Sequence, residues 1–301
     1  MTVVRKKRLK LKKKNFTIFI ICLIIVITSI IQIVKLLTNA LKKENINNEE
    51  PEIKETTTAF ENADKLNYYI KENEQRYQNY RKLNKTLTTE QIVTEVNIGL
   101  DKDYYTDSTE TINLNTPYIL VNKYHYLSEN YIPENLSTIS NQYALKDMQL
   151  VDYAKEAFEK MAKDAKKENL SIIAMSTYRS YNYQVNLYNQ YVKQDGKEKA
   201  DTYSGRAGYS EHQTGLAVDV YNGKESYTNF EITEEFKWMQ ENAYKYGFIL
   251  RFPKDKTKQT GYEYESWHYR YVGEEIATYI QENKLSYEEY YVQNIETKKV
   301  H

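Results

Sequence analysis

Cysteine, proline, glycine and histidine are all scarce in this sequence. Among 301 residues there are one cysteine, four prolines, nine glycines and four histidines. A single cysteine excludes a disulfide-rich scaffold and a metal site built from several cysteine ligands. No proline- or glycine-rich hinge is evident along the chain. Stability must therefore come from an ordinary hydrophobic core, and the chain is long enough to form one large domain or two small ones.

Acidic residues are absent from the first 37 positions. Residues 1–14 contain eight lysines and arginines, and residues 16–34 then run for nineteen positions without a charge. In a helix such a run is roughly 28 Å long, close to the thickness of about 30 Å of a bilayer core. No small-x-small cleavage site follows it, so an uncleaved anchor is a better interpretation than a signal peptide.

The basic block before the apolar run predicts the topology. Such a block stays in the cytoplasm, so the C-terminal bulk of the chain is expected outside the cell membrane, with a single crossing. Beyond residue 37 the chain has 33 basic and 42 acidic residues, a net charge of −9. A mildly acidic exterior argues against a nucleic-acid partner, because nucleic acids bind basic faces.

Composition divides the chain into five expected segments. Residues 38–60 are polar and charged, and residues 61–95 are rich in helix formers. We therefore expect a cytoplasmic basic segment, a transmembrane anchor, an extracellular linker with a helical stalk, one folded domain and a tail. Their boundaries are 1–14, 15–37, 38–110, 111–290 and 291–301.

Hydrophobic periodicity predicts the secondary structure of the folded part. Apolar residues at helical spacing predict helices over 140–167, 181–192, 233–246 and 274–283. Short apolar or alternating runs predict strands over 170–178, 216–221, 248–252 and 267–272, and a strand followed by a turn over 118–127. Strands and helices mix without a repeated βαβ unit. This favours an α+β fold with a mostly antiparallel central sheet flanked by helices.

Two of the four histidines have a well-placed carboxylate nearby. His301 is terminal, and His125 lies in a tyrosine-rich turn where a packing or surface role is expected. His212 precedes a glycine and an alternating strand that contains Asp219. An aspartate in such a strand is unfavourable by several kcal/mol unless its charge is compensated, and a metal would compensate it. Together with His268, these residues would form a set of three ligands and leave a fourth position for water.

The second histidine lies in the segment YESWHYRYV, with Glu265 three residues before His268. A carboxylate that is near a metal without binding it can take the proton of the attacking water and later protonate the leaving amine. Spacing alone leaves the alternative open that both histidines are ordinary packed residues. The residues alone support the two interpretations about equally.

The segments SEHQTGLAVD (210–219) and ESWH (265–268) resemble the S-x-H-x-x-G-x-A-x-D and E-x-W-H signatures of VanY-type D-alanyl-D-alanine carboxypeptidases. These belong to a zinc peptidase superfamily that includes lysostaphin-like endopeptidases and hedgehog-like domains. VNKYHYLSENYIPENL and STYRSYNYQ also resemble earlier blocks of the family, and the resemblance covers roughly residues 115–285.

The resemblance implies a role for each matching residue. It implies that Zn²⁺ is the cofactor, bound by His212, Asp219 and His268, and that Glu265 is the general base and acid.

The remaining implied roles concern the substrate. Arg179 matches the arginine that stabilises the oxyanion, and Gln184 and Ser210 match positions that contact the terminal residue of the peptide. Without the family, these would be a surface ion-pair partner, a helix-face amide and a loop hydroxyl. Ala207 stands where many members have proline, which removes no chemical group.

The expected function is therefore a membrane-anchored, zinc-dependent carboxypeptidase that removes the C-terminal D-alanine from peptidoglycan stem peptides. One alternative is an L,D-carboxypeptidase acting on tetrapeptide stems. A second is a non-catalytic, zinc-containing module that binds the wall, although Glu265 and Arg179 argue against it because a structural zinc needs neither. A third alternative is a structural protein that binds no metal, but the match to the family motifs would then be coincidental.

Overall fold

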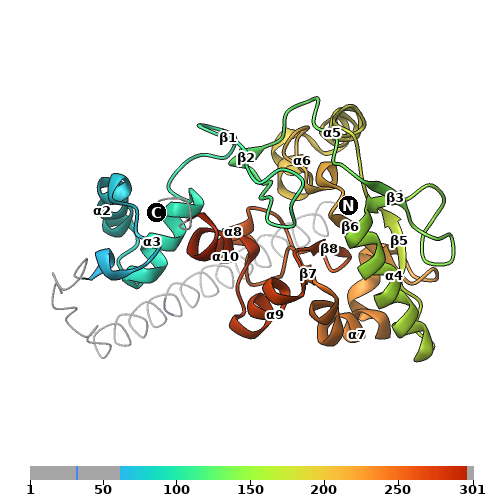
Figure 1. Ribbon diagram of the computed structural model, residues 1–301. Coiled ribbons are helices and arrows are strands. Elements are labelled where there is room, and N and C mark those ends of the chain that lie inside the picture. Colours follow the sequence, from blue (N-terminus) through green and yellow to red (C-terminus); the bar gives the residue numbers. More distant parts are fainter. Residues whose placement is uncertain (1–31, 33–61, 297–301) are drawn as a thin grey trace, which may run out of the picture. The chain divides into compact units, whose positions relative to one another are not determined.

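The structure is a computed structural model that describes Gln32 and residues 62–296, and residues 62–296 belong to one compact unit (Figure 1). Its α-helices are α2 (Glu74–Leu83), α3 (Thr89–Ile98), α4 (Asp152–Lys167), α5 (Tyr181–Asp195), α6 (Lys197–Tyr203), α7 (Glu234–Asn242), α8 (Thr257–Thr260), α9 (Glu274–Asn283) and α10 (Tyr287–Asn294). Its strands are β1 (Thr109–Glu110), β2 (His125–Tyr126), β3 (Leu136–Thr138), β4 (Gln149–Val151), β5 (Ile173–Ser176), β6 (Ala217–Tyr221), β7 (Phe248–Leu250) and β8 (His268–Tyr271). Short 3₁₀ turns connect them: η1 (Ala63–Lys65), η2 (Lys71–Asn73), η3 (Glu211–Thr214), η4 (Tyr227–Ile232) and η5 (Ala243–Tyr246).

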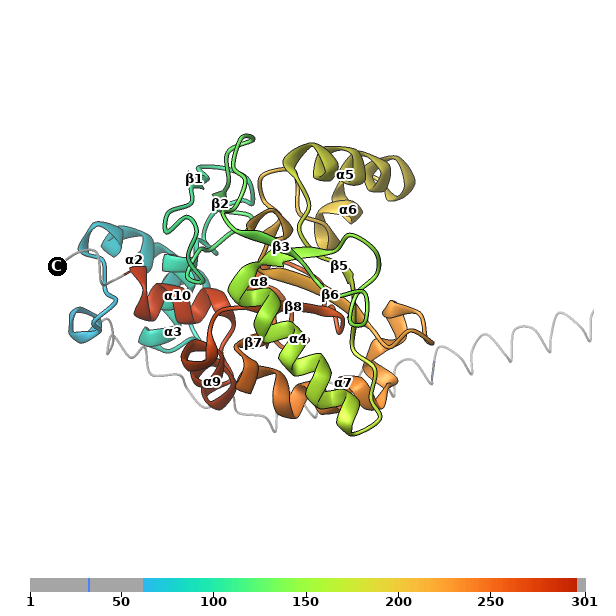
Figure 2. The ribbon, with the colours of Figure 1, turned by 45° about the vertical axis from the view of Figure 1, so that its right-hand side comes forward.

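The central sheet has four strands in the order β5-β6-β8-β7, and every neighbouring pair is antiparallel. Two smaller pairings accompany it, β3 with β4 and β1 with β2. Helices surround the sheet (Figure 2). The predicted α+β class with a mostly antiparallel sheet is thereby confirmed.

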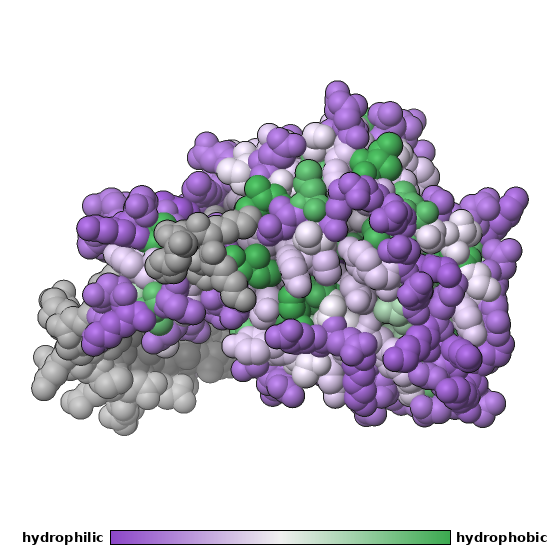
Figure 3. All heavy atoms as spheres, viewed as in Figure 1, coloured by the Kyte–Doolittle hydropathy of each residue, from purple (hydrophilic) through white to green (hydrophobic). Residues whose placement is uncertain are grey.

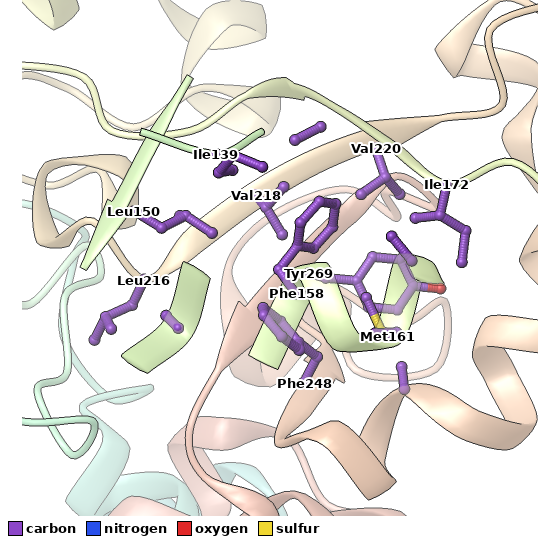
Figure 4. Close-up of a cluster of buried hydrophobic side chains, with 14 of the residues drawn as sticks. Ile139, Leu150, Phe158, Met161, Ile172, Leu216, Val218, Val220, Phe248 and Tyr269 are labelled. Carbon is purple, nitrogen blue, oxygen red and sulfur yellow. The ribbon is translucent and has the colours of Figure 1, made fainter. Parts of the chain in front are cut away.

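One face of the sheet is fully apolar. Leu216, just before β6, and Val218 and Val220 within it alternate along the chain and are at most 1 % exposed. They belong to the main core together with Phe158 and Met161 of α4, whose side chains meet them in the close-up of Figure 4. The residues between them on β6 face the other way, because successive strand residues point to opposite sides. This alternation places Asp219 on the face opposite the core.

The strands and helices in and around the sheet lie close to the ranges predicted from hydrophobic periodicity, with two exceptions. The helix expected over 140–167 begins only at Asp152. Asp147 adopts a positive φ of 61°, and β4 pairs with β3 before the helix starts. Leu145, expected on the buried stripe of that helix, is 44 % exposed. The strand expected near residue 118 is also wrong, because residues 119–121 are buried but form no strand, and β2 comes only after the turn.

The segment before the sheet forms a helical hairpin. Thr88 and Gln91 form a reciprocal capping box at the start of α3, a pairing that satisfies the free N–H groups of the first turn. Buried residues of α2 and α3 form a cluster of their own. Gln293 on α10 donates to Thr94 (3.0 Å), and Lys258 pairs with Glu95 (2.8 Å). The part of the expected stalk from residue 62 onward is therefore folded against α8 and α10.

Within the described ranges, Gln32 and 62–296, no helix has both the length and the apolar character to cross a bilayer. The anchor predicted over 15–37 lies outside the described residues, apart from Gln32. On the face drawn in Figure 3, hydrophilic side chains predominate at the margin and hydrophobic ones gather toward the middle.

Candidate metal centre

Asp219 and His268 are brought together by strand pairing. Asp219 on β6 stands directly opposite His268 on β8 in the antiparallel register. Directly paired residues share a face of the sheet, so both side chains project away from the core. The Asp219 Oδ1 atom lies 2.9 Å from His268 Nδ1. Two of the three predicted ligands are thus a cross-strand pair.

His212 reaches the same point from the turn that precedes β6. Gly215 ends this turn in the left-handed conformation (φ 67°), which reverses the chain so that β6 can begin. The His212 Nδ1–H group donates to the Thr177 carbonyl (2.7 Å), so its Nε2 atom carries the lone pair. That Nε2 is buried, has no hydrogen-bond partner, and lies 3.3 Å from Asp219 Oδ2.

The donor set fits a small cation. One ligand atom from each of His212, Asp219 and His268 lies within 4.8 Å of the others, and all three side chains are buried. Zinc bonds of about 2.1 Å in a tetrahedron would place ligand atoms about 3.4 Å apart, close to the His212–Asp219 separation. A lone pair of His212 facing a carboxylate in a buried site is unfavourable unless a cation lies between them.

Burial and neighbouring charges shift the pKa values of the three candidate ligands in different directions. Burial, reinforced by Arg179, lowers the pKa of His212 to about 4, so its imidazole is neutral and able to bind a metal. Burial alone would raise the pKa of Asp219, but His212 and His268 hold it well below its usual range. Burial would also lower the pKa of His268, but the neighbouring Asp219 and Glu211 carboxylates outweigh it and raise the pKa to about 9. A metal that binds here must therefore displace the proton of His268, because a ligating imidazole is neutral.

Glu265 lies beside this set. It is 8 % exposed, and its Oε2 atom is 3.7 Å from His268 Nδ1. Its backbone N–H donates to the Phe252 carbonyl, which holds the segment before β8. Burial raises the pKa of Glu265 to about 8, with His268 opposing the shift. A buried carboxylate in this position is suited to exchange protons with a bound water.

The predicted ligands and Glu265 open into one cleft of about 610 Å³. Arg179 and Ser210 line the same cleft. The Arg179 backbone N–H donates to the His212 carbonyl (3.1 Å), and its side-chain Nε is buried without a partner. Arg179 is therefore attached to the turn that holds a metal ligand and has unused hydrogen-bonding capacity.

Gln184 does not line the cleft. Its side-chain amide donates to the Gly205 carbonyl (2.7 Å) and to Ser204 (3.4 Å), two residues that do line it. In the structure the Gln184 amide supports the wall of the cleft, and its direct contact with the peptide stays a prediction.

The cleft continues away from the ligands along α5 and α6, which lie side by side (Figure 1). Tyr183, Leu187 and Tyr191 line it at intervals of one helical turn. It is also lined by charged groups of both signs, Asp195, Lys199 and Glu263. The cleft therefore combines an aromatic wall with charged groups.

Sequence reasoning missed Glu211, a buried carboxylate next to the ligand His212. Its Oε2 atom lies 3.6 Å from His268 Nε2, and its Oε1 atom accepts from Arg251 and Arg270. The signal that could have found it is the presence of two arginines in strands expected to be buried. Buried arginines need a carboxylate partner, and Glu211 directly precedes the candidate ligand His212 in the sequence.

The sequence of the chain also matches a known protein family. The family model described as VanY, D-alanyl-D-alanine carboxypeptidase, matches residues 147–274. The match includes all three candidate ligands, Glu265 and Arg179.

Individual relatives match over a wider range. The protein YodJ of Bacillus subtilis (strain 168) is 41 % identical over 206 residues, which are 64 % of this chain and 76 % of YodJ. The structure of the LdcB LD-carboxypeptidase is 41 % identical, with a TM-score of 0.55 over 59 % of this chain and 87 % of that one. A variant of the vancomycin-resistance D,D-pentapeptidase VanY, in complex with Zn(II), is 34 % identical, with a TM-score of 0.51 over 58 % of this chain and 98 % of that one.

Proposed function

Since the chain belongs to the VanY family of D-alanyl-D-alanine carboxypeptidases, we propose that it removes the C-terminal D-alanine from peptidoglycan stem peptides. It is a zinc-dependent peptidase of that family. The observation that supports the proposed reaction most directly is the convergence of His212, Asp219 and His268 with Glu265 in one buried cleft.

The reaction is hydrolysis of the last peptide bond. His212, Asp219 and His268 would hold a zinc ion, which would lower the pKa of a bound water and polarise the scissile carbonyl. Glu265 takes the proton of the attacking water as the new C–O bond forms, and returns it to the amine as the C–N bond breaks. The Arg179 guanidinium stabilises the negative charge that develops on the carbonyl oxygen. Each of these groups lines the cleft.

The volume and lining of the cleft favour a peptide longer than two residues. Besides the ligands, it is lined by Tyr183, Leu187 and Tyr191 of α5 and by Lys199 of α6. A free dipeptide would leave this wall unused, whereas a stem peptide has further residues that can contact it. We therefore expect kcat/KM to increase from D-Ala-D-Ala to a pentapeptide stem, because contacts with remote parts of a substrate contribute to transition-state binding.

L,D-carboxypeptidase activity is the second candidate. It is favoured by the similarity to the LdcB LD-carboxypeptidase, which has the higher TM-score of the two solved structures. The two activities differ in the configuration of the residue before the terminal D-alanine. Incubating the full chain with a pentapeptide ending in D-Ala-D-Ala and with a tetrapeptide ending in an L-centre and D-Ala distinguishes them, with released D-alanine measured by mass. Release from neither peptide would contradict both.

We also propose that the chain is anchored in the cell membrane by residues 15–37, with the enzymatic part outside, facing the wall. The basic block and the apolar run of the sequence support this. Protease added to intact protoplasts should then digest the part beyond residue 38. Digestion only after lysis would contradict the proposed location.

A further inference from the structure

Glu211 is a buried acid with two cationic partners. It is 4 % exposed, and its Oε1 atom accepts from Arg251 Nε (2.8 Å) and from Arg270 NH1 (2.9 Å). Both arginines are at most 1 % exposed. Their guanidinium groups form buried ion pairs with Glu211, which compensate its charge inside the core.

The other oxygen of Glu211 faces a metal ligand. Glu211 Oε2 and His268 Nε2 are both buried without a hydrogen-bond partner, and they lie 3.6 Å apart. The opposite nitrogen of the same ring, Nδ1, faces Asp219 and is the one available to a metal. When Nδ1 binds a cation, Nε2 must carry the proton, and Glu211 Oε2 is then its acceptor.

We propose that Glu211 is a positioning residue that orients the His268 ring and fixes its tautomer, so that Nδ1 binds zinc. This inference rests on the zinc site of the proposed function. A carboxylate that accepts the second N–H of a ligating histidine makes the ligand more basic and restrains its ring. Phe252 packs on the same ring (4.8 Å between centroids) and restrains it further.

The position of Glu211 is in turn set by the C-terminal helix. Glu288 on α10 is 1 % exposed and accepts from Arg251 NH1 (2.8 Å) with one oxygen and from NH2 with the other. Arg270 also donates to the carbonyls of Pro117 and Ile119. Glu288 lies beyond the residues that match the family model. The chain of contacts from Glu288 through Arg251 and Glu211 to His268 therefore connects α10 to the metal centre.

The test is the zinc affinity of a Glu211→Gln variant of the full chain, measured by competition with a chromogenic chelator. The variant should still fold, because Arg251 still forms its ion pair with Glu288. Arg270 still donates to the carbonyls of Pro117 and Ile119. An amide oxygen is a weaker acceptor than a carboxylate, so zinc should bind about 10–100-fold more weakly, the usual effect of losing such a partner. The visible spectrum of the Co²⁺-substituted protein should also change, since a spectrum reports ligand geometry and not global stability.

Two further variants complete the experiment. Glu95→Gln removes another buried carboxylate that is paired with a lysine, but on α3 and away from the site, so its zinc affinity should equal that of the parent. Glu288→Gln should weaken zinc binding in the same direction as Glu211→Gln but by less.

Zinc affinity within about twofold of the parent in folded Glu211→Gln, with an unchanged Co²⁺ spectrum, would overturn the inference. If Glu211→Gln does not fold, an unchanged affinity in Glu288→Gln would overturn it. A parent that binds no zinc would instead overturn the proposed zinc site, and this inference with it.

Discussion

At the scale of single residues, the site can be recognised from charged side chains in segments that are otherwise apolar and buried. Asp219 interrupts an apolar strand, and its neighbours Val218 and Val220 are fully buried on the other face. Its partners His212 and His268 could be paired with it from motif and spacing. The contacts of Glu211 could not be predicted from the sequence, because they depend on two arginines that lie about 40 and 60 positions away in the chain.

Removing either histidine ligand should abolish tight zinc binding. His212→Ala and His268→Ala each leave two ligands where a catalytic zinc site uses three. The measurement is zinc content of purified full chain by elemental analysis, with about one zinc per chain expected in the parent. His125→Ala is the control, because His125 contacts Asn122 and Tyr291 and is not among the three candidate ligands. Full zinc content in both ligand variants would exclude the assigned set.

His125 should make the fold sensitive to acid. Burial lowers its pKa to about 4, whereas in the unfolded chain it titrates near its ordinary value of about 6.5. As the pH falls from about 6.5 to 4, the unfolded state binds the proton first, so the free energy of unfolding decreases. His125→Gln should lose this part of the dependence.

Urea unfolding of the metal-free proteins at a series of pH values tests this. The free energy of unfolding of His125→Gln should fall less steeply between pH 6.5 and 4 than that of the parent. Parallel curves would show that His125 is not protonated differently in the two states.

At the scale of elements, the turn between the first two ligands depends on Gly215. A Cβ atom there would lie 2.9 Å from Leu136 Cδ2 and 3.1 Å from Val151 Cγ2, in a left-handed backbone conformation. Gly215→Ala should cost about 1 kcal/mol from the backbone and about 1–3 kcal/mol more from the overlap. It should also weaken zinc binding, because His212 and Asp219 flank the turn.

Gly99→Ala is the matched control for this substitution. Gly99 is also left-handed, but its Cβ would approach Tyr124 no closer than 3.3 Å, and it ends α3. Urea unfolding should rank the parent above Gly99→Ala and Gly99→Ala above Gly215→Ala. Equal stability of the two variants would contradict the assigned packing.

Most helices and strands of the central part could be predicted, because the spacing of apolar residues within each segment already indicates which side is buried. The run 274–283 corresponds to α9, and the alternation of 216–221 corresponds to β6. The start of α4 could not be predicted, because the preceding apolar residues pair as a strand with β3 instead of continuing the helix. Helix α10 was assigned no element, since its tyrosines and acids show little amphipathic pattern and its burial comes from packing against α3.

At the scale of the whole molecule, the N-terminal hairpin and the C-terminal helix are parts of one folded unit with the sheet. The amides of α3 should therefore be protected from hydrogen exchange to a similar degree as those of β6 and α10, because they open together. Exchange followed by mass spectrometry on the full chain measures this. Exchange in α3 that is orders of magnitude faster than in β6 would show that the hairpin is an independent appendage.

The central claim is that Glu265 transfers the proton in a zinc-dependent hydrolysis of the terminal peptide bond. The most direct measurement is the rate of D-alanine release from a stem peptide by Glu265→Gln, compared with the parent at equal zinc content. The amide occupies the same space but cannot accept a proton, so we expect a folded, zinc-loaded protein that is at least about a hundredfold slower. Turnover near that of the parent would contradict the assignment.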